Sequence, residues 1–259
     1  MSARDSKERE REIYNAGYAA DDLLPAADTM LRVQRGSRTW REDRLRAIPT
    51  GSVVLDIGCG EGATSIELAR LGFRVIGIDL SDTRVEIARE RARREGLDVQ
   101  FVQGDAERPD LPDESLDLVH CQSILHHLPD VPTALASYRR VLRPGGQLLV
   151  MEPGLLHPLA WIRRQFFPTA VHTPDEHPFV PRRLIAAIDA EFEEVETLLS
   201  SLTTLGVPVV EKVVGRRVAH GLLRMGEIAD AALLRLPGMR ELAWLISVHA
   251  VKRAAGPRA

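Results

Sequence analysis

The stretch Leu55-Asp-Ile-Gly-Cys-Gly-Glu-Gly-Ala63, "LDIGCGEGA", follows an apolar, β-branched run and places three glycines within five positions. Glycine lacks a Cβ and tolerates positive φ, so such a turn lets a ligand approach the backbone closely. The stretch contains G-x-G-x-x-A, a pattern typical of loops that hold a nucleotide after a first strand. Asp56 and Glu61 add two carboxylates to the same turn, and the ligand has to tolerate them.

Outward from this turn, residues 52–152 alternate short β-branched runs with amphipathic helical stretches, which is typical of βαβ units and a parallel sheet. Helices are expected to begin near Gly62, Ser81 and Val131, and Gly96 is expected to end the second of them. The segment 142–146, "LRPGG", is expected to end a helix and turn tightly into a strand. The expected strands cover residues 52–57, 74–79, 98–103, 116–121, 147–152, 193–200 and 245–253, and later helices cover residues 181–192 and 220–236.

The composition indicates a globular protein without a strong overall field. The chain has 259 residues, 44% of them hydrophobic, and a formal net charge of -3, which gives no general attraction to nucleic acid. Cys59 and Cys121 both lie in hydrophobic stretches, so a disulfide framework is not expected. The charged N-terminus does not resemble a signal peptide, and no apolar run approaches the roughly 18 residues of a spanning helix. A cytoplasmic protein is expected.

Charge separates two interpretations of the glycine turn. Asp79, at the end of the second expected strand, lies 21 residues after Gly58, where a carboxylate can accept both hydroxyls of a ribose. A pyrophosphate would meet Asp56 and Glu61 at short range, and like charges repel there. A nucleoside that carries a sulfonium and an ammonium group has the opposite preference.

On four motifs in order, residues 50–153 resemble the class I S-adenosylmethionine-dependent methyltransferases, in particular the branch that acts on small molecules and lipid quinones. The motifs are "VLDIGCGEG" (54–62), "VIGIDLS" (75–81), "VQGDAERPDLPDESLDLVHCQSILHHLPD" (102–130) and "VLRPGGQLLVMEPG" (141–154). The resemblance implies an α/β fold: a Rossmann-like doubly wound sheet of about seven strands, mostly parallel with an antiparallel last strand, and helices on both faces. It also implies S-adenosyl-L-methionine as cofactor and S-adenosyl-L-homocysteine as product.

The resemblance assigns roles to individual positions. Asp79 is expected to bind the ribose and Leu80 to flank the adenine. Asp105 is expected to accept a hydrogen bond from the adenine amino group, and Ala106 to supply a backbone N–H. Gln122 is expected to line the cofactor from below. The methionine-end loop is expected to comprise Asp56, Gly58, Cys59, Gly60 and Gly62. For the glycines and Asp105 the alternative is a plain turn or cap, and for the two cysteines it is core packing.

The segment after the fourth expected strand, "CQSILHHLPD", bears on the methyl acceptor. It does not resemble the "DPPY" or "NPPY" of enzymes that methylate nucleic-acid bases, and the acid pair of metal-dependent catechol enzymes is not evident. We therefore expect a small-molecule acceptor, without nucleic acid and without a metal. His127 and His126 are candidate general bases, with packing of the short helix as the alternative.

The remaining candidates lie outside the four motifs. His172, Glu176 and His177 occur within six residues of the proline-rich segment 154–180, which fits a wall of the acceptor pocket better than a metal site. Tyr14 and Tyr18 resemble an N-terminal segment that closes over the cofactor in relatives, with core packing of that helix as the alternative. Residues 204–259 carry nine Lys/Arg against four acids, a net of +5, which favours a lipid-like acceptor or a membrane surface, with a solvated helix face as the alternative.

The expected organisation has four parts: an N-terminal helical cap (1–50), the cofactor-binding core (51–153), an acceptor-side lid (154–180), and a C-terminal completion of the sheet (181–259) with a helical insertion (201–244). The leading hypothesis is methyl transfer to O, N or C of a small hydrophobic or aromatic metabolite. Two alternatives stay open: a nicotinamide-dependent oxidoreductase, which the acids of the turn disfavour, and a non-catalytic S-adenosylmethionine-binding sensor or assembly protein. The sequence leaves the oligomeric state open.

Overall fold

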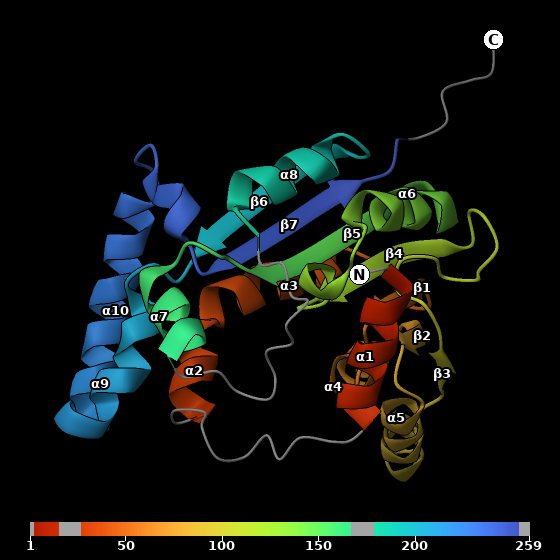
Figure 1. The fold of residues 1–259 in the computed structure, drawn as a ribbon, viewed down its shortest axis with the longest axis horizontal. Helices are drawn as coiled ribbons and strands as arrows, with labels where there is room; N and C mark the ends of the chain where they lie inside the picture. The colour runs from red at the N-terminus through yellow and green to blue at the C-terminus, as the bar shows by residue number, and fades with distance from the viewer. Residues whose placement is uncertain (1–2, 16–26, 167–178, 254–259) are drawn as a thin grey trace.

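The computed structural model describes residues 3–15, 27–166 and 179–253, and its centre is a seven-stranded sheet (Figure 1). The strand order is β3-β2-β1-β4-β5-β7-β6, and β7 runs antiparallel to both of its neighbours. This confirms the expected mostly parallel sheet with an antiparallel last strand. The strands are β1 (Val53–Ile57), β2 (Arg74–Asp79), β3 (Val99–Gln103), β4 (Leu116–Gln122), β5 (Leu142–Pro153), β6 (Glu193–Ser200) and β7 (Leu245–Val251).

Helices cover both faces of the sheet, because successive strand residues point to opposite sides. On one face, Val54 and Leu118 pack in a cluster with Leu45 and Leu68 from the helices α3 (Arg35–Arg46) and α4 (Ala63–Arg70). On the other face, the next strand residues pack against α6 (Val131–Val141) and α8 (Pro181–Asp189), which Figure 1 shows together above the sheet. The sheet thus forms the middle layer of three.

The helix α5 (Asp82–Arg94) begins and ends where its sequence predicts. The Ser81 hydroxyl accepts a hydrogen bond from the Arg84 N–H (3.2 Å), which caps the first turn. Val85 and Ala88 are buried on one face. Gly96, with φ +65°, takes the chain out of the helix, as expected.

Several boundaries differ from the sequence prediction. β5 begins at Leu142 rather than at 147, because backbone hydrogen bonds between Lys252 and the Gly145–Gly146 turn continue the sheet through "LRPGG". α8 ends at Asp189, and α10 (Arg216–Leu233) begins four residues before the expected start at 220. The segment 154–180 contains a helix, α7 (Pro158–Phe166), that is absent from the helices predicted above.

A group of helices, here called the helical lobe, lies beside the carboxyl ends of β5 and β6 (Figure 1). The lobe is held together by the buried Asp230, whose carboxylate accepts hydrogen bonds from the backbone N–H groups of Leu202 (3.0 Å) and Thr203 (2.6 Å). Its elements are α2 (Ala27–Val33), α7, the turn η2 (Thr204–Gly206), α9 (Val207–Val214) and α10. Within the described part of the chain, no helix combines the length and the apolar character that crossing a membrane requires.

Candidate functional site

The glycine turn lies between β1 and α4, at the carboxyl edge of the sheet. Gly58, Gly60 and Gly62 all have positive φ (67°, 53° and 84°). A Cβ at Gly58 would lie 2.5 Å from the Ile124 side chain, and one at Gly62 would lie 2.9 Å from Phe101. Conformation and packing therefore both require glycine at these two positions.

Asp79, at the carboxyl end of β2, fixes the turn from below. Its Oδ2 accepts a hydrogen bond from the Gly60 N–H (2.8 Å), and its Oδ1 accepts one from the Ser81 N–H (2.9 Å). The carboxylate is 8% exposed, at the point where the first two strands end. The predicted ribose-binding residue is thus oriented by backbone donors, and its remaining lone pairs stay available to a ligand.

Asp105 follows β3 and is held in the same way. Its Oδ1 accepts from the Glu107 N–H (2.9 Å), and its Oδ2 accepts from the Lys7 Nζ (2.8 Å). Burial alone would lower the pKa of Lys7, but hydrogen bonds to Asp105 and Glu107 raise it. Lys7 belongs to α1 (Ala3–Asn15), so the N-terminal helix is tied directly to the predicted adenine end of the site.

A cavity brings five of the ten predicted cofactor residues together. It contains predicted residues from three strand ends, and α1 supplies part of its wall. The cavity is lined by Lys7, Glu10, Tyr14, Gly58, Asp79, Leu80, Arg84, Asp105, Ala106, Ser123, Ile124, His127, Leu128 and Pro129. The sequence prediction for the nucleoside end of the site and the geometry therefore coincide in one place.

His127 faces this cavity, from the short 3-10 helix η1 (Leu125–His127). Its Nδ1 lies 2.6 Å from Glu10 Oε1, and the Tyr14 hydroxyl lies 3.5 Å from the ring nitrogens. The Arg84 guanidinium lies 4.2 Å from the centre of the Tyr14 ring, a cation–π contact. Of the two candidate bases, His127 is therefore the one with access to the ligand cavity.

His126 is buried and points to a different partner. Its Nδ1 lies 2.6 Å from Oε2 of Glu152. Glu152 is fully buried and is the second-to-last residue of β5. The sequence analysis did not single out Glu152, although an acid inside the apolar run "LLVMEPG" is a signal that could have found it. This geometry matches the packing alternative for His126.

The two acids of the glycine turn do not face the cavity. Asp56 is 2% exposed, and its carboxylate accepts from the Ser65 hydroxyl (2.6 Å) and contacts His120 Nδ1 (2.9 Å). Glu61 pairs with Arg91 of α5 at 2.5 Å. Neither acid lines the cavity described above, and each has a protein partner, so the charge selectivity inferred from the sequence stays a prediction.

Gln122, at the carboxyl end of β4, accepts a hydrogen bond from Arg41 (3.2 Å), a second residue that the sequence analysis did not find. Arg41 is 3% exposed and also pairs with Glu67 at 2.5 Å. Its Nε is buried without a hydrogen-bond partner in the described part of the chain. Ser123, next in the chain, has φ +54°, a conformation that is rare for serine and that occurs at functional sites.

The two cysteines behave as core residues. Cys59 and Cys121 are buried and unpaired. Burial, followed by the nearby carboxylates, raises the pKa of both thiols well above the usual range. Neither thiol is activated as a nucleophile.

Four of the predicted acceptor-pocket residues, Tyr18, His172, Glu176 and His177, lie outside the described residues and remain predictions. Among residues 3–15, 27–166 and 179–253, no group of three His, Cys, Asp or Glu side chains has an arrangement that could hold a metal ion.

The comparison with known proteins points to the same part of the chain. Residues 55–150 match the family model described as a methyltransferase domain. A ubiquinone biosynthesis O-methyltransferase of Hahella chejuensis is 36% identical over 107 residues, which cover 41% of this chain and 44% of that protein. The chain thus matches less than half the length of this curated relative.

Solved structures share the fold over nearly the whole chain. The cyclase SpnF superposes with a TM-score of 0.60 at 20% identity and covers 98% of both chains. The phosphoethanolamine N-methyltransferase 2 of Haemonchus contortus, in complex with S-adenosyl-L-methionine, has a TM-score of 0.59 at 18% identity, over 98% of this chain and 60% of that one. Together with the strand order and the glycine turn, these matches show that residues 55–150 form a methyltransferase domain with the class I, Rossmann-like fold.

Proposed function

We propose that this chain is an S-adenosyl-L-methionine-dependent methyltransferase that acts on O, N or C of a small hydrophobic or aromatic metabolite, such as a natural product, a quinone or a lipid-like molecule. One observation carries the proposal: the cavity beside the glycine turn of the methyltransferase domain is lined by both Asp79 and Asp105. Two oriented carboxylates at this edge match the hydroxyls of a ribose and the amino group of an adenine.

The residues at the site fit this cofactor. The glycine turn allows close backbone approach, and Asp79 and Asp105 are both held by backbone donors. Arg41, which lies outside the lining of this cavity and pairs with Glu67, is a buried cation at the carboxyl end of β4, and we infer that its orphaned Nε takes the cofactor carboxylate. A nucleoside with an amino-acid tail therefore finds a partner at each end.

S-adenosyl-L-methionine supplies an already activated methyl group, so the protein has mainly to align the reactants and exclude water. Tyr14 and Glu10 of α1 form the wall opposite the strand ends. With the ring proton on Nδ1 of His127, the nitrogen nearer Glu10, Nε2 keeps a lone pair that can take the proton of a hydroxyl or amine acceptor. We assign the base to His127 rather than to His126, because His126 is occupied by Glu152.

Calorimetry with S-adenosyl-L-methionine, S-adenosyl-L-homocysteine and NAD tests the cofactor. We expect the two adenosyl compounds to bind and Asp79→Ala to weaken binding at least tenfold. Asp82→Ala is the matched control, because Asp82 lies nearby on α5 and its side chain, within the described part of the chain, bonds only to Thr83. Binding of NAD alone would favour the oxidoreductase alternative.

Incubation of the protein with labelled cofactor and a cell extract, followed by mass spectrometry, tests the acceptor. A methylated small molecule is the expected result. With that acceptor, His127→Ala should reduce kcat about 100-fold. If the cofactor binds and no acceptor is ever labelled, the sensor alternative gains. The unpaired Cys59 and Cys121 lead us to propose a reducing compartment such as the cytoplasm as the place of action.

A further inference from the structure

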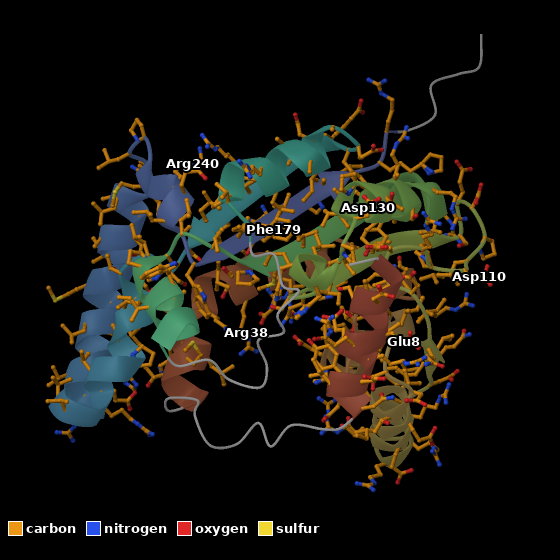
Figure 2. All side chains as sticks on the ribbon, in the orientation of Figure 1. Glu8, Arg38, Asp110, Asp130, Phe179 and Arg240 are labelled. Atoms are coloured by element: carbon orange, nitrogen blue, oxygen red, sulfur yellow. The ribbon has the colours of Figure 1, made fainter. Side chains whose placement is uncertain are left out.

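The outer surface of α9 and α10 exposes an unusual number of apolar side chains. Val213, Met225 and Ile228 are 88%, 69% and 74% exposed. We call this surface, together with the arginines beside it, the α10 face; it forms the outer side of the helical lobe, where Figure 2 shows side chains projecting away from the sheet. Its exposed apolar residues are Val210, Val213, Val214, Val218, Leu222, Met225, Ile228 and Leu236.

These residues form a stripe that is separate from the packed side of the helix. Val218, Leu222 and Met225 have i, i+4, i+7 spacing, which places them on one side of α10. Ala219 and Leu223 are buried on the side that packs against the lobe. The exposed stripe is therefore not needed to hold the helix in place, and removing it should leave the fold intact.

A row of arginines runs along the same helix. Arg217 and Arg224 are seven residues apart, two turns of an α-helix, and both are exposed. Within the described part of the chain, neither of them forms an ion pair.

Two of the three acids of these two helices contact other protein groups. Glu211 contacts the Thr29 hydroxyl and Arg216, and Asp230 is buried beneath Leu202 and Thr203. Glu227 is exposed. The α10 face therefore combines apolar and positively charged groups.

We propose that the α10 face docks on an anionic phospholipid bilayer. A helix with an apolar stripe beside a row of arginines has the chemistry of one that lies in the membrane interface, with its apolar side chains among the acyl chains and its guanidinium groups at the phosphates. A second copy of the chain fits less well, because it would bring two rows of arginines together.

Docking in this orientation would place the helical lobe, and with it the carboxyl end of β5, close to the lipid. A hydrophobic acceptor concentrates in a bilayer, so docking names a source for the acceptor of the proposed function. That consequence rests on the proposed function, whereas docking itself does not. The two are tested separately, because vesicle binding needs neither cofactor nor acceptor.

Sedimentation of the full chain with vesicles tests the proposal. We expect binding to vesicles of phosphatidylcholine mixed with phosphatidylglycerol, weaker binding at high salt, and little binding to phosphatidylcholine alone. The double variant Arg217→Gln/Arg224→Gln should weaken binding about fivefold per arginine. Met225→Glu/Ile228→Glu should weaken it at least tenfold.

Matched controls lie on α5, at the other end of the molecule (Figure 1). Arg93→Gln/Arg94→Gln removes the same charge from exposed positions, and Ile87→Glu places an acid at an exposed apolar residue. Both should bind vesicles as the wild type does. Circular dichroism and calorimetry with S-adenosyl-L-methionine check that each variant is folded. If Met225→Glu/Ile228→Glu does not fold, vesicle binding by Arg217→Gln/Arg224→Gln tests the proposal.

Three results would overturn the proposal: no binding to anionic vesicles, binding that the α10-face variants leave unchanged, or self-association that these variants abolish in a chain that does not bind lipid. Size-exclusion chromatography with light scattering detects the last of these. Loss of methyl transfer with intact vesicle binding would count against the proposed function alone.

Discussion

Oε2 of Glu152 lies 2.6 Å from Nδ1 of His126, and both side chains are buried beneath the ligand cavity. Oε1 of the same carboxylate accepts hydrogen bonds from the backbone N–H groups of Ile124 (2.9 Å) and Leu125 (2.8 Å). A single acid at the end of β5 thereby fixes the start of η1. His127 follows His126 directly and lines the cavity, so Glu152 also sets the position of His127.

Replacement of Glu152 should destabilise the protein markedly. Glu152→Leu leaves two backbone N–H groups and an imidazole without their acceptor, and we expect a loss of about 3 kcal/mol in the free energy of unfolding. Glu152→Gln keeps one oxygen as an acceptor and should cost about half as much. Urea denaturation measures both, and equal stability of Glu152→Leu and wild type would contradict the assigned role.

Alanine at Gly58 should disturb the site, whereas alanine at Gly96 should not. Both glycines have positive φ, but a Cβ at Gly58 would overlap Ile124, and a Cβ at Gly96 meets nothing within 4 Å. Gly96→Ala should cost about 1 kcal/mol of stability from backbone strain alone. Gly58→Ala should cost about 2–3 kcal/mol and abolish S-adenosyl-L-methionine binding.

Thermal unfolding and calorimetry of the same two variants separate strain from packing. If both variants lost stability equally and both still bound the cofactor, the contact between the turn and Ile124 would not be needed for cofactor binding.

The cysteines should be unreactive in the folded protein. Cys59 and Cys121 are buried, and burial raises the pKa of each thiol, so almost no thiolate exists at neutral pH. A chromogenic thiol reagent should therefore label neither residue in native protein and both in urea. Rapid labelling of one thiol under native conditions would show that its surroundings open.

Stability should fall in mild acid through two histidines. Burial lowers the pKa of His157 and of His249 below the usual 6.5. As the pH falls below about 6.5, the unfolded chain takes up protons that the folded chain does not, so stability is full above that pH and decreases below it. The neutral His157 ring donates to the carbonyl oxygen of Leu202 at 2.8 Å, which ties the start of α7 to the segment between β6 and η2 inside the helical lobe.

Urea midpoints at about pH 7.5 and about pH 5.5 measure this effect. His157→Asn should be less stable than wild type at the higher pH and should lose less stability than wild type on acidification. An identical pH dependence in the two proteins would remove His157 from the explanation.

The sequence by itself determined the core of the fold, and it pointed to Asp79 and Asp105, which line one cavity and whose binding role is a proposal. Strand periodicity, the Ser81 cap and the glycine turn are local signals, and each is set by residues within a few positions of one another. Asp79 and Asp105 could be found because each directly follows a strand, and the carboxyl ends of parallel strands meet at one edge of a sheet.

The tertiary structure alone decided which charged groups line the cavity. Asp56 and Asp79 both lie in strands that lead to the site, but Asp56 is taken up by Ser65 and His120, and only Asp79 reaches the cavity. Arg41 and Glu152 meet partners more than 25 residues away in the chain. Such pairings follow from the order in which strands assemble and helices pack, and this order brings together residues that no local pattern in the sequence connects.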